Sequence, residues 1–389
     1  MKPFADRLSR LGTETAFEVL ARAKALEAQG KEIIHMEIGE PDFDTPGYIK
    51  QAAKEALDQG YTHYTPAAGI TEVRQTIADY IAETRRIPVK VENVVVVPGG
   101  KPIMFYTIMA LVNEGDEVIY PNPGFPIYKS MINFMGGVPV PLPLREECEF
   151  SCVMDEFKSL VTPRTKLIIL NSPGNPCGGV MGKADLEIVA ELALKHDCYV
   201  LSDEIYSRLI YEGEPFSIAQ LPGMQERTII LDGFSKTYAM TGWRLGFGVM
   251  NTELAGWATK LMTNSNSCTA AYTQMAGMAA LKGDQTEATQ MVEEFRRRRD
   301  VIVAGLNRIP GIRCCKPHGA FYVFPNVSGL GKSAKEIADL LLYEAGVATL
   351  AGTSFGKYGE GYLRFSYATS MENIHKALAR IREVVSKLK

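Results

Sequence analysis

The sequence lacks the features that mark several classes of protein. No apolar stretch reaches the roughly 18 residues that a membrane-spanning helix needs. The opening segment, Met1 to Asp6, has no apolar region of the kind found in a signal peptide, so we expect a cytosolic protein. The 42 basic and 45 acidic residues leave a formal charge of −3, which gives no electrostatic reason to bind nucleic acid or an anionic membrane.

Metal-binding and redox motifs are missing as well. The seven cysteines are an odd number at no metal-ligand spacing, which predicts reduced thiols rather than a disulfide framework. The five histidines are scattered without a His-Glu-x-x-His motif, so we expect no metal site. The glycine-rich turn after residues 94–97 lacks the pattern Gly-x-Gly-x-x-Gly, so we expect no nicotinamide site there.

The sequence does contain alternating helical and β-rich stretches from about residue 46 to 285. This alternation is typical of an α/β domain with a mostly parallel sheet flanked by helices. A long amphipathic stretch near residues 285–308 leads to a second, smaller α+β unit. In that unit we expect strands near residues 312–315, 320–324 and 362–367 and a closing helix near 371–388.

A lysine lies among largely apolar and small residues between Asp232 and Phe247. Desolvation lowers the pKa of an amine and favours the neutral form, which can attack an aldehyde to form a Schiff base. This amine belongs to Lys236, and Arg244 follows in the same segment as a candidate for holding a phosphate. Taken alone, the pair is equally explained by surface side chains whose stems lie on apolar neighbours.

Three other apolar runs end in polar or glycine residues. The run 167–170 leads to Asn175, and the run from Tyr199 leads to Asp203 and Tyr206. Buried parallel strands deliver such side chains to a crevice at their carboxyl ends, although a turn or a helix cap would explain each residue singly. The third run, 94–97, precedes Gly99, Gly100, Lys101 and Pro102. Glycine amides at a helix start favour phosphate, but many such turns bind nothing.

Together these motifs resemble the class I and II aminotransferases, the fold type I family that depends on pyridoxal 5′-phosphate. The resemblance runs from about Glu37, through the segments beginning at Gly39 and Tyr64, to Leu363-Arg-Phe-Ser-Tyr367, and it covers nearly the whole chain. It implies a large cofactor-binding domain at residues 46–285 and a small domain made of 1–45 and 286–389. The motifs are similar to a branch with many prokaryotic aspartate and aromatic aminotransferases, and they do not separate those activities.

The resemblance also assigns roles to individual residues. Lys236 would bond to the cofactor and move a proton at the substrate α-carbon, while Asp203 would keep the pyridine nitrogen protonated. Further cofactor contacts are implied for Tyr206 and Asn175 at the ring hydroxyl, for Gly100, Lys101, Ser235 and Arg244 at the phosphate, and for Phe125 on the ring face. It also implies a homodimer with shared active sites, in which Tyr64 reaches the phosphate of the other subunit.

Arg364 supports a substrate site on separate grounds. Strand alternation puts Tyr362, Arg364 and Ser366 on one face, where an arginine among aromatic residues is costly unless an anion pairs with it. A guanidinium matches a carboxylate in two parallel hydrogen bonds. The resemblance assigns Arg364 to the substrate α-carboxylate, with Asn175 and the backbone at Gly39, and an internal salt bridge is the alternative.

The substrate is left open by the sequence. Lys101 is a candidate for binding a second carboxylate, and a solvated lysine at a helix start is the alternative. We therefore expect transfer of the amino group of an L-amino acid to a 2-oxo acid such as 2-oxoglutarate. Aspartate or glutamate is favoured, with aromatic and small neutral donors still open. A pyridoxal-phosphate-dependent C–S β-lyase and a non-catalytic ligand-sensing module are the alternative interpretations.

Overall fold

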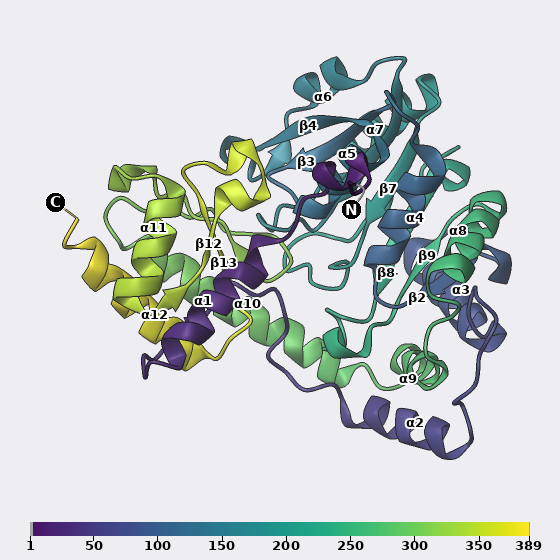
Figure 1. The fold of residues 1–389 in the computed structure, drawn as a ribbon, viewed down its shortest axis with the longest axis horizontal. Coiled ribbons are helices and arrows are strands. Elements are labelled where there is room, and N and C mark those ends of the chain that lie inside the picture. The colour runs from purple at the N-terminus through teal and green to yellow at the C-terminus, as the bar shows by residue number, and fades with distance from the viewer. Residues whose placement is uncertain (1–2, 389) are drawn as a thin grey trace.

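A mixed eight-stranded sheet organises the larger part of the chain, whose computed structural model describes residues 3–388. The strands follow the order β2-β9-β8-β7-β6-β3-β4-β5, and they can be followed in Figure 1. Their bounds are Val94–Val97 (β2), Glu117–Asn122 (β3), Val138–Arg145 (β4), Ser151–Cys152 (β5), Thr165–Asn171 (β6), Tyr199–Asp203 (β7), Thr228–Gly233 (β8) and Gly246–Val249 (β9).

The direction of the strands determines where polar side chains gather. The pairs β4–β3, β3–β6, β6–β7 and β7–β8 are parallel, and β9 is antiparallel to both β8 and β2. Strand β2 therefore runs in the same direction as β8, and the carboxyl ends of β2, β3, β6, β7 and β8 lie at one edge. Polar residues that follow these strands meet at that edge.

Helices cover both faces of this sheet, so its strands are largely apolar. Even the edge strand β2 shows this, since Val95 and Val97 belong to the core on one face while Val94 and Val96 belong to the core on the other. The first core is completed by α4 (Lys101–Leu111), α5 (Pro126–Met135) and α8 (Thr252–Ser265). On the opposite face lie α3 (Thr71–Arg85), α9 (Ala271–Lys282), α6 (Met154–Leu160) and α7 (Lys183–Lys195), with α2 (Gly47–Asp58) packed on α9.

A separate core lies outside the eight-stranded sheet and is built from both ends of the chain; it is called the second core below. Strand β1 (Ile34–His35) pairs in parallel with β11 (Val347–Ala348), which ties the N-terminal segment to the C-terminal part. A three-stranded antiparallel sheet lies beside them, with the order β10 (Tyr322–Val323), β13 (Leu363–Ser366) and β12 (Leu350–Ala351). The helices around it are α1 (Thr15–Glu27), α10 (Thr286–Leu306), α11 (Ala334–Leu340) and α12 (Met371–Val385); in Figure 1 α1, α11 and α12 lie on the left, and α10 extends from there toward α9.

Two expected strands are shorter than the sequence pattern indicates. Residues 312–315 form only a single bridge, between Arg313 and Asn326, because the backbone N–H and C=O of Cys314 bond to the side chain of Asn307 instead of to a strand. In the stretch 320–324 only Tyr322–Val323 is a strand, since Ala320 has a left-handed φ of +57° that breaks the extended conformation. The expected helices near 285–308 and 371–388 match α10 and α12.

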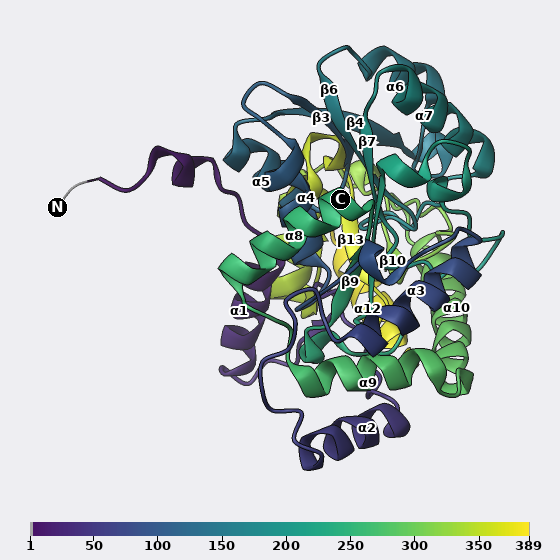
Figure 2. The same cartoon turned by 90° about the vertical axis from the view of Figure 1, so that its right-hand side faces the viewer.

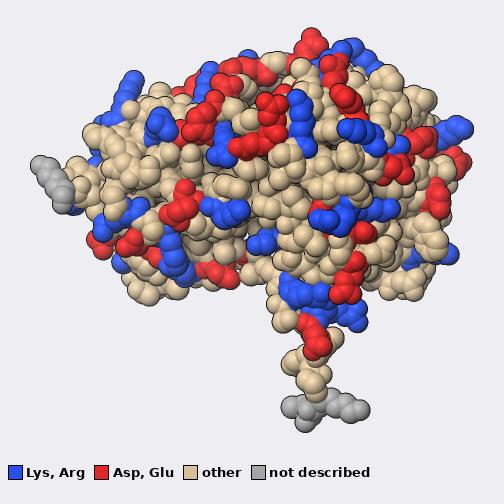
Figure 3. All heavy atoms as spheres, turned by 90° about the horizontal axis from the view of Figure 1, so that it is seen from above, with Lys and Arg blue, Asp and Glu red and all other residues tan. Residues whose placement is uncertain are grey.

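The remaining features concern possible membrane spans and metal sites, the charge of the surface and the position of the N-terminal segment. Within residues 3–388, no helix is long and apolar enough to cross a bilayer, and no histidine, cysteine and carboxylate side chains cluster as metal ligands would. Figure 3 shows basic and acidic side chains interspersed over one face of the molecule. The segment that contains the 3-10 helix Asp6–Arg10 projects away from the body in Figure 2.

Candidate active site

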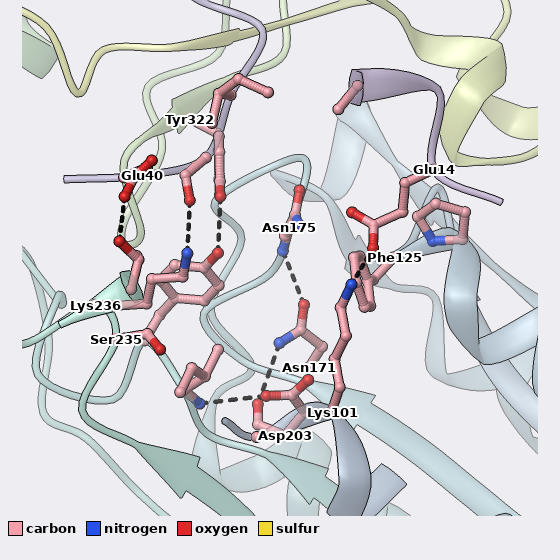
Figure 4. A pocket seen from close by; sticks show the side chains of 18 of the residues that line it. Glu14, Glu40, Lys101, Phe125, Asn171, Asn175, Asp203, Ser235, Lys236 and Tyr322 are labelled. Atoms are coloured by element: carbon pink, nitrogen blue, oxygen red, sulfur yellow. Dashed lines mark hydrogen bonds and ion pairs between the residues drawn. The ribbon is translucent and has the colours of Figure 1, made fainter. Parts of the chain in front are cut away.

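A cavity of about 520 Å³ lies at the edge where the parallel strands end, and residues of the second core close its other side. It brings together every predicted site residue except Tyr64. Those residues are Gly39, Gly100, Lys101, Phe125, Asn175, Asp203, Tyr206, Ser235, Lys236, Arg244 and Arg364. Figure 4 shows side chains converging on the cavity from both halves of the molecule.

Lys236 follows β8 and points into this cavity. Its Nζ donates a hydrogen bond of 2.5 Å to the carbonyl oxygen of Gly39 and lies 5.7 Å from the centre of the Phe321 ring. Burial lowers the pKa of Lys236 to about 8, and the charge of Glu40 partly opposes this shift. A substantial fraction of the amine is therefore neutral near physiological pH, as a nucleophile requires.

Asp203 is the last residue of β7 and lies on the floor of the cavity, only 8% exposed. Its Oδ2 accepts a 2.6 Å hydrogen bond from the Tyr128 hydroxyl, and its Oδ1 accepts one from the backbone N–H of Ile205. Burial raises the pKa of Asp203 to about 6, although both hydrogen bonds favour the ionised form. The site thus holds a fixed carboxylate that a nearby cation would stabilise.

Arg364 is buried, with 4% of its surface exposed. One guanidinium nitrogen donates to Asn175 Oδ1 at 3.2 Å and another donates to the carbonyl oxygen of Glu37, while Nε has no partner. The guanidinium carbon lies 4.6 Å from the centre of the Tyr322 ring and 4.9 Å from that of Phe355. In the described part of the chain, no carboxylate forms an ion pair with Arg364, so the salt-bridge alternative lacks a partner.

Arg244 packs against the glycine turn that precedes α4. A Cβ added to Gly99 would lie 2.1 Å from Arg244 Nη2, so a larger residue at this position would displace the guanidinium. Gly99 also has a φ of +85°, which disfavours other residues. Arg244 itself has a left-handed φ of +53°, a conformation that costs energy and orients its side chain toward the turn. Ser235 lines the cavity as well.

Tyr206 and Gly39 are positioned by a residue of the second core, Tyr322. The hydroxyls of Tyr206 and Tyr322 are 2.8 Å apart. A Cβ at Gly39 would lie 2.0 Å from the Tyr322 hydroxyl, so this hydroxyl leaves room only for glycine. The first contact joins β10 to the segment after β7 of the main sheet, and the second packs the segment before α2 against β10.

Lys101 begins α4 at the opposite side of the cavity. Its Nζ forms an ion pair with Glu14 and lies 5.3 Å from the centre of the Phe125 ring. Phe125 packs edge-to-face on Tyr128, with ring centres 5.7 Å apart. Figure 4 shows Lys101 extending past Phe125 toward Glu14.

Tyr64 does not join this cavity in its own chain. Its side chain is 90% exposed on the surface, in the segment between α2 and α3. A role within the same subunit is therefore excluded by its position, whereas its predicted role across a dimer axis stays a prediction.

Several residues of the site are missed by the sequence motifs. Tyr128 supports Asp203, Tyr322 supports Tyr206, and Glu14 pairs with Lys101. Asn171 links two predicted residues, because its Oδ1 accepts from the backbone N–H of Asn175 and its Nδ2 donates to the carbonyl of Asp203. The sequence could have indicated Asn171 as a site residue, since it is the first polar residue after a buried run. Tyr128, Tyr322 and Glu14 lie in segments without such a pattern.

Comparison with known proteins agrees with this geometry. The model of the family described as aminotransferase class I and II matches residues 31–381. The chain is 42% identical to an aspartate aminotransferase of Pyrococcus abyssi, over 92% of this chain and 93% of that protein. It is 38% identical to aromatic-amino-acid aminotransferase 2 of Thermococcus litoralis over 99% of each.

Solved structures are also similar over the full fold. The aspartate aminotransferase of Thermus thermophilus with maleate superposes with a TM-score of 0.94 at 38% identity, covering 99% of this chain and 100% of that one. An alanine aminotransferase from Pyrococcus furiosus gives 0.93 at 30% identity, again over 99% and 100%. The chain therefore belongs to the class I and II aminotransferases and is a transaminase that depends on pyridoxal phosphate.

Proposed function

We propose that this transaminase moves the amino group of a dicarboxylic L-amino acid, aspartate or glutamate, to a 2-oxo acid such as 2-oxoglutarate. The observation that carries the proposal is the buried, carboxylate-free guanidinium of Arg364 on the same cavity as the Lys236 amine and the Lys101 ammonium. A buried cation without an anionic partner is costly, and a substrate α-carboxylate would offset that cost with two parallel hydrogen bonds.

The residues present fit pyridoxal phosphate. The cofactor supplies an aldehyde that bonds to amines and a ring that withdraws electrons from the substrate α-carbon. The close approach of Arg244 to Gly99, with Gly100 and Ser235 on the same side of the cavity, suits a phosphate. The buried carboxylate of Asp203 suits a protonated ring nitrogen, and Phe125 suits the ring face.

Each catalytic role follows from the chemistry of the side chain. Lys236 would hold the cofactor and, as a free amine, would move the proton at the substrate α-carbon; its pKa of about 8 suits both tasks. Asp203 would keep the ring nitrogen protonated. Tyr206 and Asn175 would donate hydrogen bonds to the ring oxygen, and Tyr128 and Asn171 hold Asp203 and Asn175 in place.

Substrate binding is assigned to cationic groups at two separate places. Arg364, the Asn175 amide and the backbone at Gly39 bind the α-carboxylate, and Lys101 binds the distal carboxylate. The similarity to a Thermus thermophilus enzyme crystallised with maleate, a dicarboxylate, supports this choice. Because an aromatic-amino-acid aminotransferase is nearly as similar, the donor preference needs a direct test.

The proposed active form is a cytosolic homodimer with shared active sites. Within each subunit, residues 46–285 form the large domain, and 1–45 with 286–389 form the small domain, which the β1–β11 pairing supports. The exposed aromatic side chains of Phe4 (88%), Phe17 (62%) and Tyr64 (90%) support contact with a partner subunit. Tyr64 then completes the phosphate site of the other subunit.

A panel of amino donors tests the proposal. Aspartate, phenylalanine, tyrosine and alanine are each offered with 2-oxoglutarate, and aspartate, glutamate, phenylalanine and tyrosine are each offered with pyruvate, because a donor paired with its own 2-oxo acid gives no new amino acid. The new amino acid is quantified in every case. We expect the highest kcat/KM with aspartate or glutamate. A clear preference for an aromatic donor would contradict the dicarboxylic assignment, whereas pyruvate and ammonia released from a cysteine-type substrate without an acceptor would indicate the lyase.

A further inference from the structure

An ion pair spans the mouth of the cavity between Glu14 and Lys101. Glu14 is the residue just before α1, in the N-terminal segment, and Lys101 is the first residue of α4 on the main sheet. The Glu14 side chain is 18% exposed and that of Lys101 is 45% exposed. Figure 4 shows the two charged ends meeting above Phe125.

Glu14 is unusual among the charged groups that line the cavity. The cations there are Lys101, Lys236, Arg244 and Arg364, and the carboxylates are Glu14, Glu40 and Asp203. Asp203 is held on the floor by Tyr128, and Glu40 accepts a hydrogen bond from Thr241. Glu14 is thus the carboxylate that pairs with a lysine of the cavity.

The charge of Glu14 also affects the pKa values of groups at the opposite side of the cavity. Burial lowers the pKa of Arg364 and of Lys236, and Glu14 is among the anions that oppose the shift at both residues. A substrate held by Arg364 and reacting at Lys236 therefore lies within the field of the Glu14 carboxylate.

We propose that Glu14 sets the donor specificity of the enzyme by occupying Lys101 in place of the substrate's distal carboxylate. This inference rests on the proposed function, in which Lys101 binds that carboxylate. A neutral donor leaves the Glu14–Lys101 pair intact, whereas a dicarboxylic donor has to displace Glu14 and then lies beside its negative charge. The enzyme thereby accepts both kinds of donor, and Glu14 reduces the preference for the dicarboxylic one.

The exposure of the pair limits how large this effect can be. A partly exposed ion pair contributes modestly to binding, so displacing it costs a dicarboxylic donor about fivefold in affinity. Displacing a fully buried pair would cost a dicarboxylic donor far more, roughly 100-fold or more in affinity.

The substitution Glu14→Gln tests the proposal because glutamine keeps the shape and removes the charge. Relative to the native holoenzyme, the ratio of kcat/KM for aspartate to kcat/KM for alanine should rise about fivefold. Calorimetry on the resting holoenzyme should show maleate binding tighter by a similar factor, with little change for the monocarboxylate butyrate. Glu18→Gln removes an exposed carboxylate one turn further along α1. It should change neither the ratio of kcat/KM values nor the affinity for maleate.

A second background separates competition from a structural effect. In Lys101→Gln, the further change Glu14→Gln should no longer favour aspartate over alanine. An equal gain in that background, an unchanged ratio in Glu14→Gln alone, or a fall in the ratio would overturn the proposal. A Lys101→Gln variant in which the ratio of kcat/KM for aspartate to kcat/KM for alanine equals the native ratio would instead refute the proposed function, in which Lys101 binds the distal carboxylate.

Discussion

Arg364 donates a hydrogen bond of 3.2 Å to Asn175 Oδ1, and this contact joins β13 of the second core to the loop after β6 of the main sheet. The residues are 189 positions apart in the chain. Asn175 thereby connects the substrate side of the cavity with Asn171, which in turn contacts the backbone of Asp203. Hydrogen bonds thus connect the group assigned to the substrate with those assigned to the cofactor. The effect of a substitution on either side should therefore be measured on both substrate binding and cofactor binding.

Lys236 is expected to be the lysine that bonds to the cofactor. Borohydride reduction of the holoenzyme should attach the cofactor to the peptide containing Lys236, as mass spectrometry of the digest would show. Lys236→Ala should still bind cofactor non-covalently and lose essentially all turnover, because the positioned proton carrier is gone. Label on a different lysine would contradict the assignment.

Arg364→Lys should weaken substrate binding while leaving the cofactor spectrum normal. The charge persists, but a lysine cannot form the bidentate contact or the hydrogen bond to Asn175 in the same geometry. We expect kcat/KM for aspartate to fall about 10- to 100-fold, as the loss of charged hydrogen bonds implies. An amine without an α-carboxylate serves as the control substrate. Equal losses with both substrates would indicate a structural role instead.

Arg85 should be important for stability rather than chemistry. It is 6% exposed and binds Glu204 and Asp232, each at 2.8 Å, beneath the segment that carries Lys236. Arg85→Met leaves two buried carboxylates without their cation and should lower the free energy of unfolding by about 3–5 kcal/mol. Arg145→Met, which breaks an exposed pair with Glu156, is the control and should change stability little. Urea denaturation measures both, and equal losses would count against this interpretation.

His35 predicts a pH dependence of stability. Its Nδ1 lies 2.7 Å from Oε1 of the fully buried Glu37, and this hydrogen bond, aided by Glu27, raises the pKa of His35 to about 9 from 6.5. Because the folded-state pKa is the higher one, the stabilisation is complete below pH 6.5 and is lost as the pH rises through 9. The melting-temperature difference between the native protein and His35→Gln should therefore shrink over that range.

The control for this experiment is His375→Gln, which removes an exposed histidine of α12. Its melting temperature should follow that of the native protein at every pH. A difference between the native protein and His35→Gln that stays constant from below pH 6.5 to above pH 9 would show that the histidine is not the titrating group.

Tyr64 tests the shared active site. Lys236→Ala and Tyr64→Phe should each be impaired, since each removes one contribution to every site of the dimer. Mixing the two should restore part of the activity, because a hybrid dimer contains one site with both residues intact. The shared-site model is wrong if hybrids form and activity does not return. It is also wrong if a species that sedimentation shows to be a monomer is fully active.

The sequence predicted the sheet side of the cavity better than the side built from the second core. Asn175, Asp203 and Lys236 each follow an apolar run, so the parallel-strand rule alone is enough to place them at one edge. Tyr322 and Glu14 reach the cavity only through tertiary packing of short or irregular segments. Periodicity carries no information about such contacts.

The strand errors have the same origin. Residues 312–315 have the composition of a strand, yet the Asn307 side chain bonds to the backbone of Cys314, and only one bridge forms. At Ala320 a left-handed conformation is imposed by the surrounding packing, and no propensity of alanine predicts it. By contrast, the strand at the four valines of β2 is predicted correctly, because β-branched residues favour strands.

Because β13 contacts residues from the start of the chain, the site can be completed only late in translation. Asp203 and Lys236 leave the ribosome well before Arg364, so the main sheet can fold while the last third of the chain is still being made. The contacts of Arg364 with Glu37 and Asn175 form only after nearly the whole chain has been translated. A prematurely terminated chain would therefore lack the site for the amino acid even where it retained the lysine, and truncated products would be unable to transaminate.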